Sequence, residues 1–255
     1  MNASLKIKLI PVLFASLLCG NLKAAENKRA AENKPDVPPV TTVDFRPQLA
    51  KWGLGMERQG GRNTCAVFAM SGALEFALAK QLDRGVRLSE EYLNWSANVA
   101  NGDGRDGATF SEVVNGFNRW GICRENLMPY REAQSTFFPP SGAALNDAQN
   151  IWNLGFRRHW ITRGQRMTLA DLEAVKNVMR NGYPVCGESA HCLLLIGFND
   201  DPRQPGGGTF LTRNSATVRY ETMSYAEAAQ KFYSLLWIDL PKTKNSDNEN
   251  GGGKK

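Results

Sequence analysis

A cysteine opens a stretch of the chain that is apolar on almost every helical face. From Cys65 to about Leu82 the sequence is rich in alanine, leucine and phenylalanine, with few polar interruptions. A helix that is hydrophobic all round must be buried on all sides. We therefore predict a central helix over these residues, with Thr64 as its N-cap. A fold organised around this helix has the cysteine at the helix N-terminus.

The position of Cys65 favours a reactive thiol. At a helix N-terminus, unpaired backbone N–H groups and the positive end of the helix dipole stabilise a thiolate. The preceding turn, Gln59 to Cys65, reads Gln-Gly-Gly-Arg-Asn-Thr-Cys and can hold hydrogen-bond donors near the atom that the sulfur attacks. A buried structural cysteine explains the same residues, so this stretch alone does not decide between the two interpretations.

The positive charge of the chain is concentrated at its ends. The formal net charge is +6, but residues 1–24 and the segment after residue 241 carry most of the excess lysine. The middle of the chain is nearly neutral, which argues against nucleic acid as its main partner.

Residues 1–24 have the pattern of a signal peptide. Lysines precede an apolar run at residues 9–18 that is too short to span a bilayer, and Ala24 suits the cleavage position. A lipoprotein would instead begin at Cys19, but Leu18 is larger than the residue that usually precedes a lipidated cysteine. We therefore expect an exported protein, periplasmic or secreted, without stable membrane association.

The rest of the chain divides into a linker, one folded domain and a tail. Residues 25–42 contain a short duplication and a Pro-rich break, which are typical of a solvated linker. Residues 43–240 form the predicted domain. Residues 241–255 are polar and Gly-rich and are expected to be disordered.

Helical patterns come first in the domain and strand patterns follow. Ser89 and Thr109 start two capped helices after the central one, and Thr168 starts another. Short apolar runs predict strands at 156–162, 183–186, 191–198, 209–212 and 235–240. This order predicts an α+β fold, with a helical lobe at about 43–155 and a β lobe at about 156–240.

The remaining cysteines do not form an obvious disulfide framework. Cys186 and Cys192 flank a predicted hairpin, and pairing across it is one interpretation. The two histidines lack the paired spacing of zinc ligands, so we predict no metal and no cofactor. The acidic loop at 101–107 is interpreted as a surface turn or a calcium loop, although it lacks EF-hand spacing.

A cysteine nucleophile needs a nearby base, and the base needs an orienting partner. His191 begins an apolar strand, and Asn214 ends the next strand along the chain. Adjacent antiparallel strands bring the two side chains together, where the amide can fix the orientation of the imidazole. His159 lies among arginines and is interpreted as a structural or surface residue.

The order Gln59, Cys65, His191, Asn214 resembles that of the papain-like cysteine peptidases, as a divergent, bacterial-looking exported member. Further collinear motifs support the resemblance: Asp44-Phe45-Arg46, Leu88-Ser89-Glu90-Glu91, Asp106-Gly107-Ala108-Thr109, Gly121-Ile122, Pro129-Tyr130 and Asn214-Ser215. The resemblance implies a two-lobe fold with a cleft between a helical lobe, which holds the central helix, and a β-rich lobe. It implies hydrolysis of peptide or protein substrates through a thioester acyl-enzyme.

The same resemblance assigns roles to individual residues. Gln59 corresponds to the oxyanion-hole glutamine, and Cys65, His191 and Asn214 correspond to the catalytic triad. The substrate-binding positions that it implies are Asn63, Gly107, Ala108 and Ala190.

The chain departs from the family pattern near these positions. Ala66 replaces a tryptophan, Ser215-Ala216-Thr217 lacks the Trp-Gly that shields the histidine, and Arg62 replaces a disulfide-forming cysteine. The segment from Cys186 to His191 is also short. An amidase, isopeptidase or transferase on the same fold therefore remains an alternative, as does a non-enzymatic binding protein. The sequence leaves the oligomeric state open.

Overall fold

The helix α3, Cys65–Leu82, forms the centre of the domain, as the sequence predicts. Every residue from Ala66 to Ala79 is buried. Among the described helices, α3 alone is long and apolar enough to cross a membrane, but most of it lies inside the fold. Burial on all sides explains why no face of this helix carries a polar stripe.

The computed structural model of the chain describes residues 40–102, 104–133 and 138–241. The predicted signal peptide at 1–24, its Ala24 cleavage position and Cys19 lie outside the described residues. The predicted linker is described only from Val40 onward, and the predicted tail only at residue 241.

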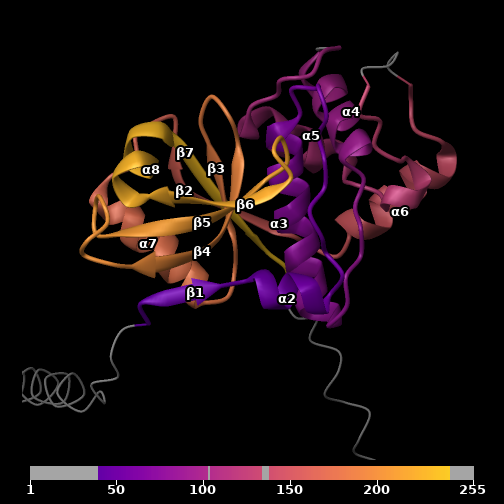
Figure 1. Cartoon of the computed structure of the whole chain (residues 1–255). Coiled ribbons are helices and arrows are strands. Elements are labelled where there is room, and N and C mark those ends of the chain that lie inside the picture. The colour runs from indigo at the N-terminus through magenta and orange to yellow at the C-terminus, as the bar shows by residue number, and fades with distance from the viewer. Residues whose placement is uncertain (1–39, 103, 134–137, 242–255) are drawn as a thin grey trace, which may run out of the picture. The chain divides into compact units, whose positions relative to one another are not determined.

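The helical lobe packs four further helices near α3. They are α2 (Arg46–Lys51), α4 (Glu90–Asn101), α5 (Phe110–Trp120) and α6 (Gly142–Trp152), with a short 3-10 helix at Glu125–Leu127. Ser89 caps α4 by accepting a hydrogen bond from the Tyr92 N–H, and Thr109 forms a capping box with Glu112 on α5, as predicted. Figure 1 shows α4, α5 and α6 together on one side of α3.

The β lobe is a single antiparallel sheet on the other side of α3 (Figure 1). Its strands are β1 (Thr42–Asp44), β2 (Arg157–Arg163), β3 (Val185–Glu188), β4 (Leu193–Asp200), β5 (Gly208–Asn214), β6 (Arg219–Ser224) and β7 (Ser234–Asp239). Six of them follow the order β2-β7-β3-β4-β5-β6, and β1 pairs with β4. Two helices, α7 (Leu169–Arg180) and α8 (Tyr225–Lys231), complete the lobe. Helices followed by strands thus give the predicted α+β fold.

Close packing fixes α3 against the sheet. A β-carbon at Gly72 would lie 3.0 Å from Leu194 Cδ2 and 3.2 Å from Arg213 Nη1. Glycine therefore lets α3 approach β4 and β5 closely, because a side chain here would require Leu194 and Arg213 to shift. His191 lies just before β4, and Asn214 ends β5.

The structure answers two local questions, the pairing of Cys186 with Cys192 and the capping of α3 at Thr64. Cys186 and Cys192 are both free thiols, and the Cys186 thiol donates a hydrogen bond to the Ala69 carbonyl oxygen of α3. Thr64 precedes α3 but does not cap it with its side chain. Its hydroxyl lies 2.7 Å from the Tyr130 hydroxyl instead, so a tertiary contact has replaced the local one.

Candidate active site

The Cys65 thiol is the first side chain of α3 and is half-buried. Hydrogen bonds from the Cys192 thiol, the His191 ring and the Cys192 backbone N–H lower the pKa of Cys65 to about 4, against burial, which raises it. The same interaction raises the pKa of Cys192. Cys65 is therefore the more acidic of the two thiols.

The His191 ring lies between Cys65 and Asn214. Its Nε2 is 2.8 Å from Asn214 Oδ1. An amide oxygen can only accept, so Nε2 carries a proton and the other ring nitrogen is left for Cys65. The hydrogen bond with Cys65 raises the pKa of His191, and the bond to Asn214 adds to that effect while burial opposes it. The arrangement favours an imidazolium beside a thiolate.

Asn214 ends β5, which pairs with β4 as neighbouring antiparallel strands. Its Oδ1 also accepts a hydrogen bond of 3.0 Å from the Ala216 N–H. Its Nδ2 donates a hydrogen bond of 2.9 Å to Glu221 Oε2 on β6. The amide is therefore held from both ends in the orientation that presents oxygen to His191.

The buried Gln59 side chain is also fixed in orientation. Its Oε1 accepts a 2.7 Å hydrogen bond from the Ser215 hydroxyl, and its Nε2 donates a 2.9 Å bond to the Arg62 carbonyl oxygen. The Tyr130 hydroxyl holds the Gln59 backbone by donating to its carbonyl oxygen. One Nε2 hydrogen takes part in the bond to Arg62, and an amide nitrogen has a second to offer.

Arg62 links the turn before Cys65 to two other segments. Its buried guanidinium donates to both carboxylate oxygens of Asp106, to Glu91 Oε2 and to the Arg131 carbonyl oxygen. Burial works against the charge, but the bonds to Asp106 and Glu91 keep the pKa of Arg62 above its usual value. Ion pairs thus connect the turn before Cys65 to α4 and to the loop that contains Asp106.

The four residues predicted to bind substrate lie on the loops around Cys65 and His191. Asn63 and Gly107 are exposed neighbours, since a β-carbon at Gly107 would lie 4.0 Å from Asn63 Cβ. Ala108 is half-buried and follows on the same loop. Ala190 is exposed and directly precedes His191 in the β3–β4 connection. Their contact with substrate stays a prediction.

The alternative of a calcium loop gains no support from the described part of the acidic loop. Asp106 uses its carboxylate on Arg62 and on the Asn94 side-chain amide, while Asp103 lies outside the described residues. No group of three His, Cys, Asp or Glu side chains within the described ranges is arranged to hold a metal ion.

His159, the other histidine, takes a structural place at the edge of the sheet. It stacks on Trp237 and its Nε2 lies 2.9 Å from Asp239 Oδ1. Asp239 is 80 residues away in the sequence, so the sequence around His159 gave no sign of this partner.

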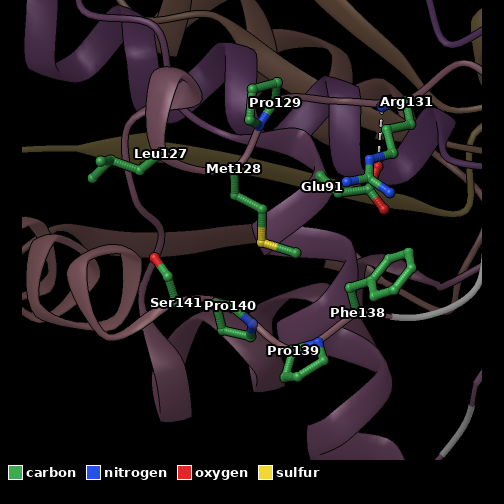
Figure 2. Close-up of a pocket in the computed structure, with 9 residues that line it drawn as sticks. All are labelled: Glu91, Leu127, Met128, Pro129, Arg131, Phe138, Pro139, Pro140 and Ser141. Carbon is green, nitrogen blue, oxygen red and sulfur yellow. Dashed lines mark hydrogen bonds between the residues drawn. The ribbon is translucent and has the colours of Figure 1, made fainter.

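A separate pocket of about 190 Å³ lies in the helical lobe. Met128 reaches from one wall toward Pro139 and Pro140 on the other, with Glu91 and Arg131 at one end (Figure 2). Neither Cys65 nor His191 lines it. Glu91 and Arg131, which line the pocket, both accept hydrogen bonds from Arg62 of the turn before Cys65.

Three solved structures share this architecture. The digestive procathepsin L 3 of the Tenebrio molitor larval midgut aligns with a TM-score of 0.59 at 18% identity, over 81% of this chain and 72% of that one. The ragweed pollen cysteine protease Amb a 11, in its proform, gives 0.59 at 17% identity, over 86% and 75%. A structure from work on the mite allergens Blo t 1 and Der p 1 gives 0.58 at 15% identity, over 82% and 73%. The chain has a papain-like fold.

The matches to known proteins are matches to solved structures. No protein-family model and no curated protein matches the sequence. At identities of 15–18% the similarity establishes the fold, and the fold is that of cysteine proteases.

Several side chains of the site have no counterpart in the sequence prediction. Arg62 pairs with acids 29 and 44 residues away. Glu221 itself lies on β6, a strand that the sequence analysis does not predict. Cys192 was considered only as a partner for Cys186. Successive residues of a regular strand face opposite ways, so the sequence held no signal that Cys192 also lies near Cys65.

Proposed function

We propose that this chain is an exported cysteine peptidase that hydrolyses peptide bonds. Cys65 is the nucleophile, His191 the general acid and base, Asn214 the orienting residue and Gln59 an oxyanion-hole donor. The observation that carries the proposal is the position of the His191 ring. Its Nε2 lies 2.8 Å from Asn214 Oδ1. The interaction with Cys65, at the N-terminus of α3, raises the pKa of the same ring. The papain-like fold supports the same assignment.

The reaction follows from these roles. The Cys65 thiolate attacks the carbonyl carbon of the substrate amide, and the Gln59 amide and the Cys65 backbone N–H stabilise the oxyanion. His191 donates its proton to the leaving amine and then takes a proton from the water that hydrolyses the thioester. Asn63, Gly107, Ala108 and Ala190 contact the substrate along the cleft. The reaction needs no cofactor.

The cellular setting of the proposal rests on residues 1–24. Their signal-peptide pattern implies a periplasmic or secreted enzyme, and lipidation at Cys19 is the less favoured alternative. Its substrates are then peptides or proteins outside the cytoplasm.

The test is labelling by an epoxide inhibitor directed at active-site thiols, followed by peptide mapping. We expect a single adduct at Cys65 that His191→Ala abolishes, together with hydrolysis of a peptide library that Cys65→Ala abolishes. Cys123→Ala is the matched control, because burial raises the pKa of Cys123 to about 12 and keeps its thiol inert. Full peptidase activity in Cys65→Ala would overturn the proposal.

One observation favours a second candidate on the same fold. Only four residues, Ser189 to Cys192, connect β3 to β4 beside the base. A connection this short leaves a low cleft wall, which suits branched or cross-linked acceptors such as cell-wall peptides or protein side chains. Mass spectrometry of the products from linear peptides and from wall fragments separates an amidase, isopeptidase or transferase from a peptidase. A binding protein with an inactive cleft would give no product from either.

A further inference from the structure

The carboxylate of Glu221 on β6 binds the far end of the Asn214 amide. Glu221 Oε2 accepts a 2.9 Å hydrogen bond from Asn214 Nδ2, and Oε1 accepts a 2.7 Å bond from the Thr217 hydroxyl. Asn214 ends β5 and pairs with Arg219, so Glu221 lies two residues farther along the partner strand. The two bonds fix the carboxylate across the β5–β6 turn.

A carboxylate at this place decides which way the Asn214 amide faces. An ionised carboxylate only accepts hydrogen bonds, so it binds the NH₂ end of the amide and repels the oxygen end. Rotating the amide by 180° would put two oxygens together at Glu221 and an NH₂ group against His191 Nε2–H. Because both contacts would be lost together, Glu221 excludes the orientation that cannot accept from His191.

The residues that follow Asn214 and Ser215 give the contact between His191 and Asn214 little cover. Ala216 and Thr217 occupy the place of the Trp-Gly pair that the family resemblance leads one to expect, and both are exposed. Asn214 itself is buried, whereas Glu221 is half-buried, so water competes for the Glu221 carboxylate. A charge-assisted hydrogen bond is stronger than a neutral one and competes better with water.

We propose that Glu221 is a positioning residue of the active site, which acts through Asn214 to hold His191 in the Nε2–H form and to stabilise its imidazolium. The inference rests on the proposed function of Cys65, His191 and Asn214. It extends that function by a fourth member in the chain of contacts, Cys65 to His191 to Asn214 to Glu221.

The charge of Glu221 also acts on the His191 ring directly. The titratable groups that act on the ring are Cys65 on α3 and Glu221 on β6. Cys192, just before β4, acts on Cys65, and Glu188 on β3 acts on Cys192. Arg219 acts on Glu221. Glu221 contributes to the raised pKa of His191, and His191 in turn helps to lower the pKa of Glu221. Removing the carboxylate therefore lowers the His191 pKa, so the imidazolium deprotonates at a lower pH.

The first experiment reads the ring itself and needs no catalytic activity. Histidine side-chain ¹⁵N NMR is recorded against pH on the full chain in a Cys65→Ala background, with and without Glu221→Ala or Glu221→Gln. The sequence has two histidines, so His159 serves as an internal reference in every spectrum. We expect the His191 pKa to fall by roughly 0.5 to 1 in both Glu221 variants, with His159 unchanged.

The two variants separate the charge of Glu221 from its hydrogen bond. Gln keeps an acceptor for Asn214 Nδ2, so Glu221→Gln should retain the Nε2–H tautomer, whereas Glu221→Ala should give a mixture of tautomers. If the His191 pKa and tautomer in Glu221→Ala match those of the parent, the proposal is overturned. A loss of thermal stability with an unchanged His191 pKa and tautomer would overturn it equally, since that result would mean that Glu221 only stabilises the fold.

The second experiment follows Cys65 alkylation by iodoacetamide against pH. We expect the rate constant to fall about tenfold in Glu221→Ala and about threefold in Glu221→Gln, with the alkaline limb displaced to lower pH in both. Glu227→Gln is the matched control, because Glu227 carries the same charge on the same lobe but pairs with Lys231 at the surface. Equal profiles for Glu221→Ala and Glu227→Gln would refute the role of Glu221. Absence of peptide hydrolysis in the parent chain would instead refute the proposed function. The two outcomes can be told apart, because the alkylation and NMR measurements do not require peptide hydrolysis.

Discussion

Arg62 and Asp106 form two parallel hydrogen bonds, each 2.9 Å long, that join the turn before Cys65 to the loop containing Gly107. Both side chains are buried, with 6% and 11% of their surface exposed. A planar guanidinium matches the two oxygens of a carboxylate, so the pair fixes direction as well as distance. The position of the candidate oxyanion turn relative to the predicted substrate loop therefore depends on this contact.

Loss of one partner of this pair should destabilise the domain strongly. Asp106→Ala leaves part of the buried Arg62 charge uncompensated, which typically costs about 3 kcal/mol of unfolding free energy. Urea unfolding followed by fluorescence measures the change. Glu227→Ala is the control, because its pair with Lys231 is exposed on both sides and its loss should change the midpoint little. Equal midpoints for the two variants would contradict the role of the buried pair.

Removal of the Asn214 amide should slow the reaction without abolishing it. In Asn214→Ala the His191 ring keeps its contact with Cys65 but loses its orienting partner, so kcat/KM should fall by about 10- to 100-fold. Cys65→Ala should leave no activity above background while the fold survives. Peptide hydrolysis and circular dichroism on the two variants test this difference, and an unaltered rate in Asn214→Ala would disprove the orienting role.

The Cys192 thiol should set the pH at which Cys65 becomes reactive. Its hydrogen bond is the largest influence that lowers the pKa of Cys65 to about 4. Above that pH the thiolate is present, and below it the protonated thiol is inert. Cys192→Ala removes the donor, so the midpoint of the alkylation rate should move to higher pH. A midpoint that stays near 4 would assign the low pKa to His191 and the helix terminus alone.

Glu125 should make the domain less stable as the pH rises. Burial raises the pKa of Glu125 to about 7, despite the hydrogen bond that its carboxylate accepts from the Tyr130 N–H. The folded form thus holds a proton that the unfolded chain releases near pH 4.5. The protonated carboxyl therefore contributes its full share of the unfolding free energy below pH 4.5, and this share is lost as the pH rises through 7. Glu125→Gln keeps an acceptor and does not ionise. Its urea midpoint should exceed that of the parent more at pH 8 than at pH 5, and an equal difference at both would contradict the argument.

Val218 should be replaceable with a gain in stability. Its φ of 56° puts a β-branched residue in the left-handed region, in the turn between Asn214 and Arg219. This conformation costs roughly 1–2 kcal/mol for a side chain with a β-carbon, and asparagine tolerates it best after glycine. Val218→Asn should therefore raise the unfolding free energy by about 1 kcal/mol. Val218→Ala keeps the strain and serves as the control that should show no gain.

Local patterns predicted the parts of the fold that local forces decide. The bounds of α3 and the caps at Ser89, Thr109 and Thr168 follow from apolar periodicity and side-chain hydrogen bonds within one turn. Thr64 shows the limit of such patterns. Its hydroxyl could have accepted a hydrogen bond from the first turn of α3, but it bonds instead to Tyr130, 66 residues away.

The unpredicted parts depend on contacts that no short pattern contains. The strand β6 is short and largely exposed, so its sequence has no alternation that marks a buried face. Glu221 could not be connected with Asn214 before that strand was known. The acids that bind Arg62 lie 29 and 44 residues away. The pairing of His191 with Asn214 could be predicted from the sequence, because one residue lies just before β4 and the other ends the adjacent apolar strand β5.

The ion pair at Arg62 makes the loop connection independent of redox conditions. The four cysteines of the described residues are free thiols, so the linkage between these loops is not a bond that a reductant can cleave. Dithiothreitol at a concentration that protects the Cys65 thiol from oxidation should leave the connection between the turn and the Gly107 loop intact. Folding of the domain should likewise require no oxidant and no disulfide isomerase, which makes expression in a reducing cytosol a practical route to the active form.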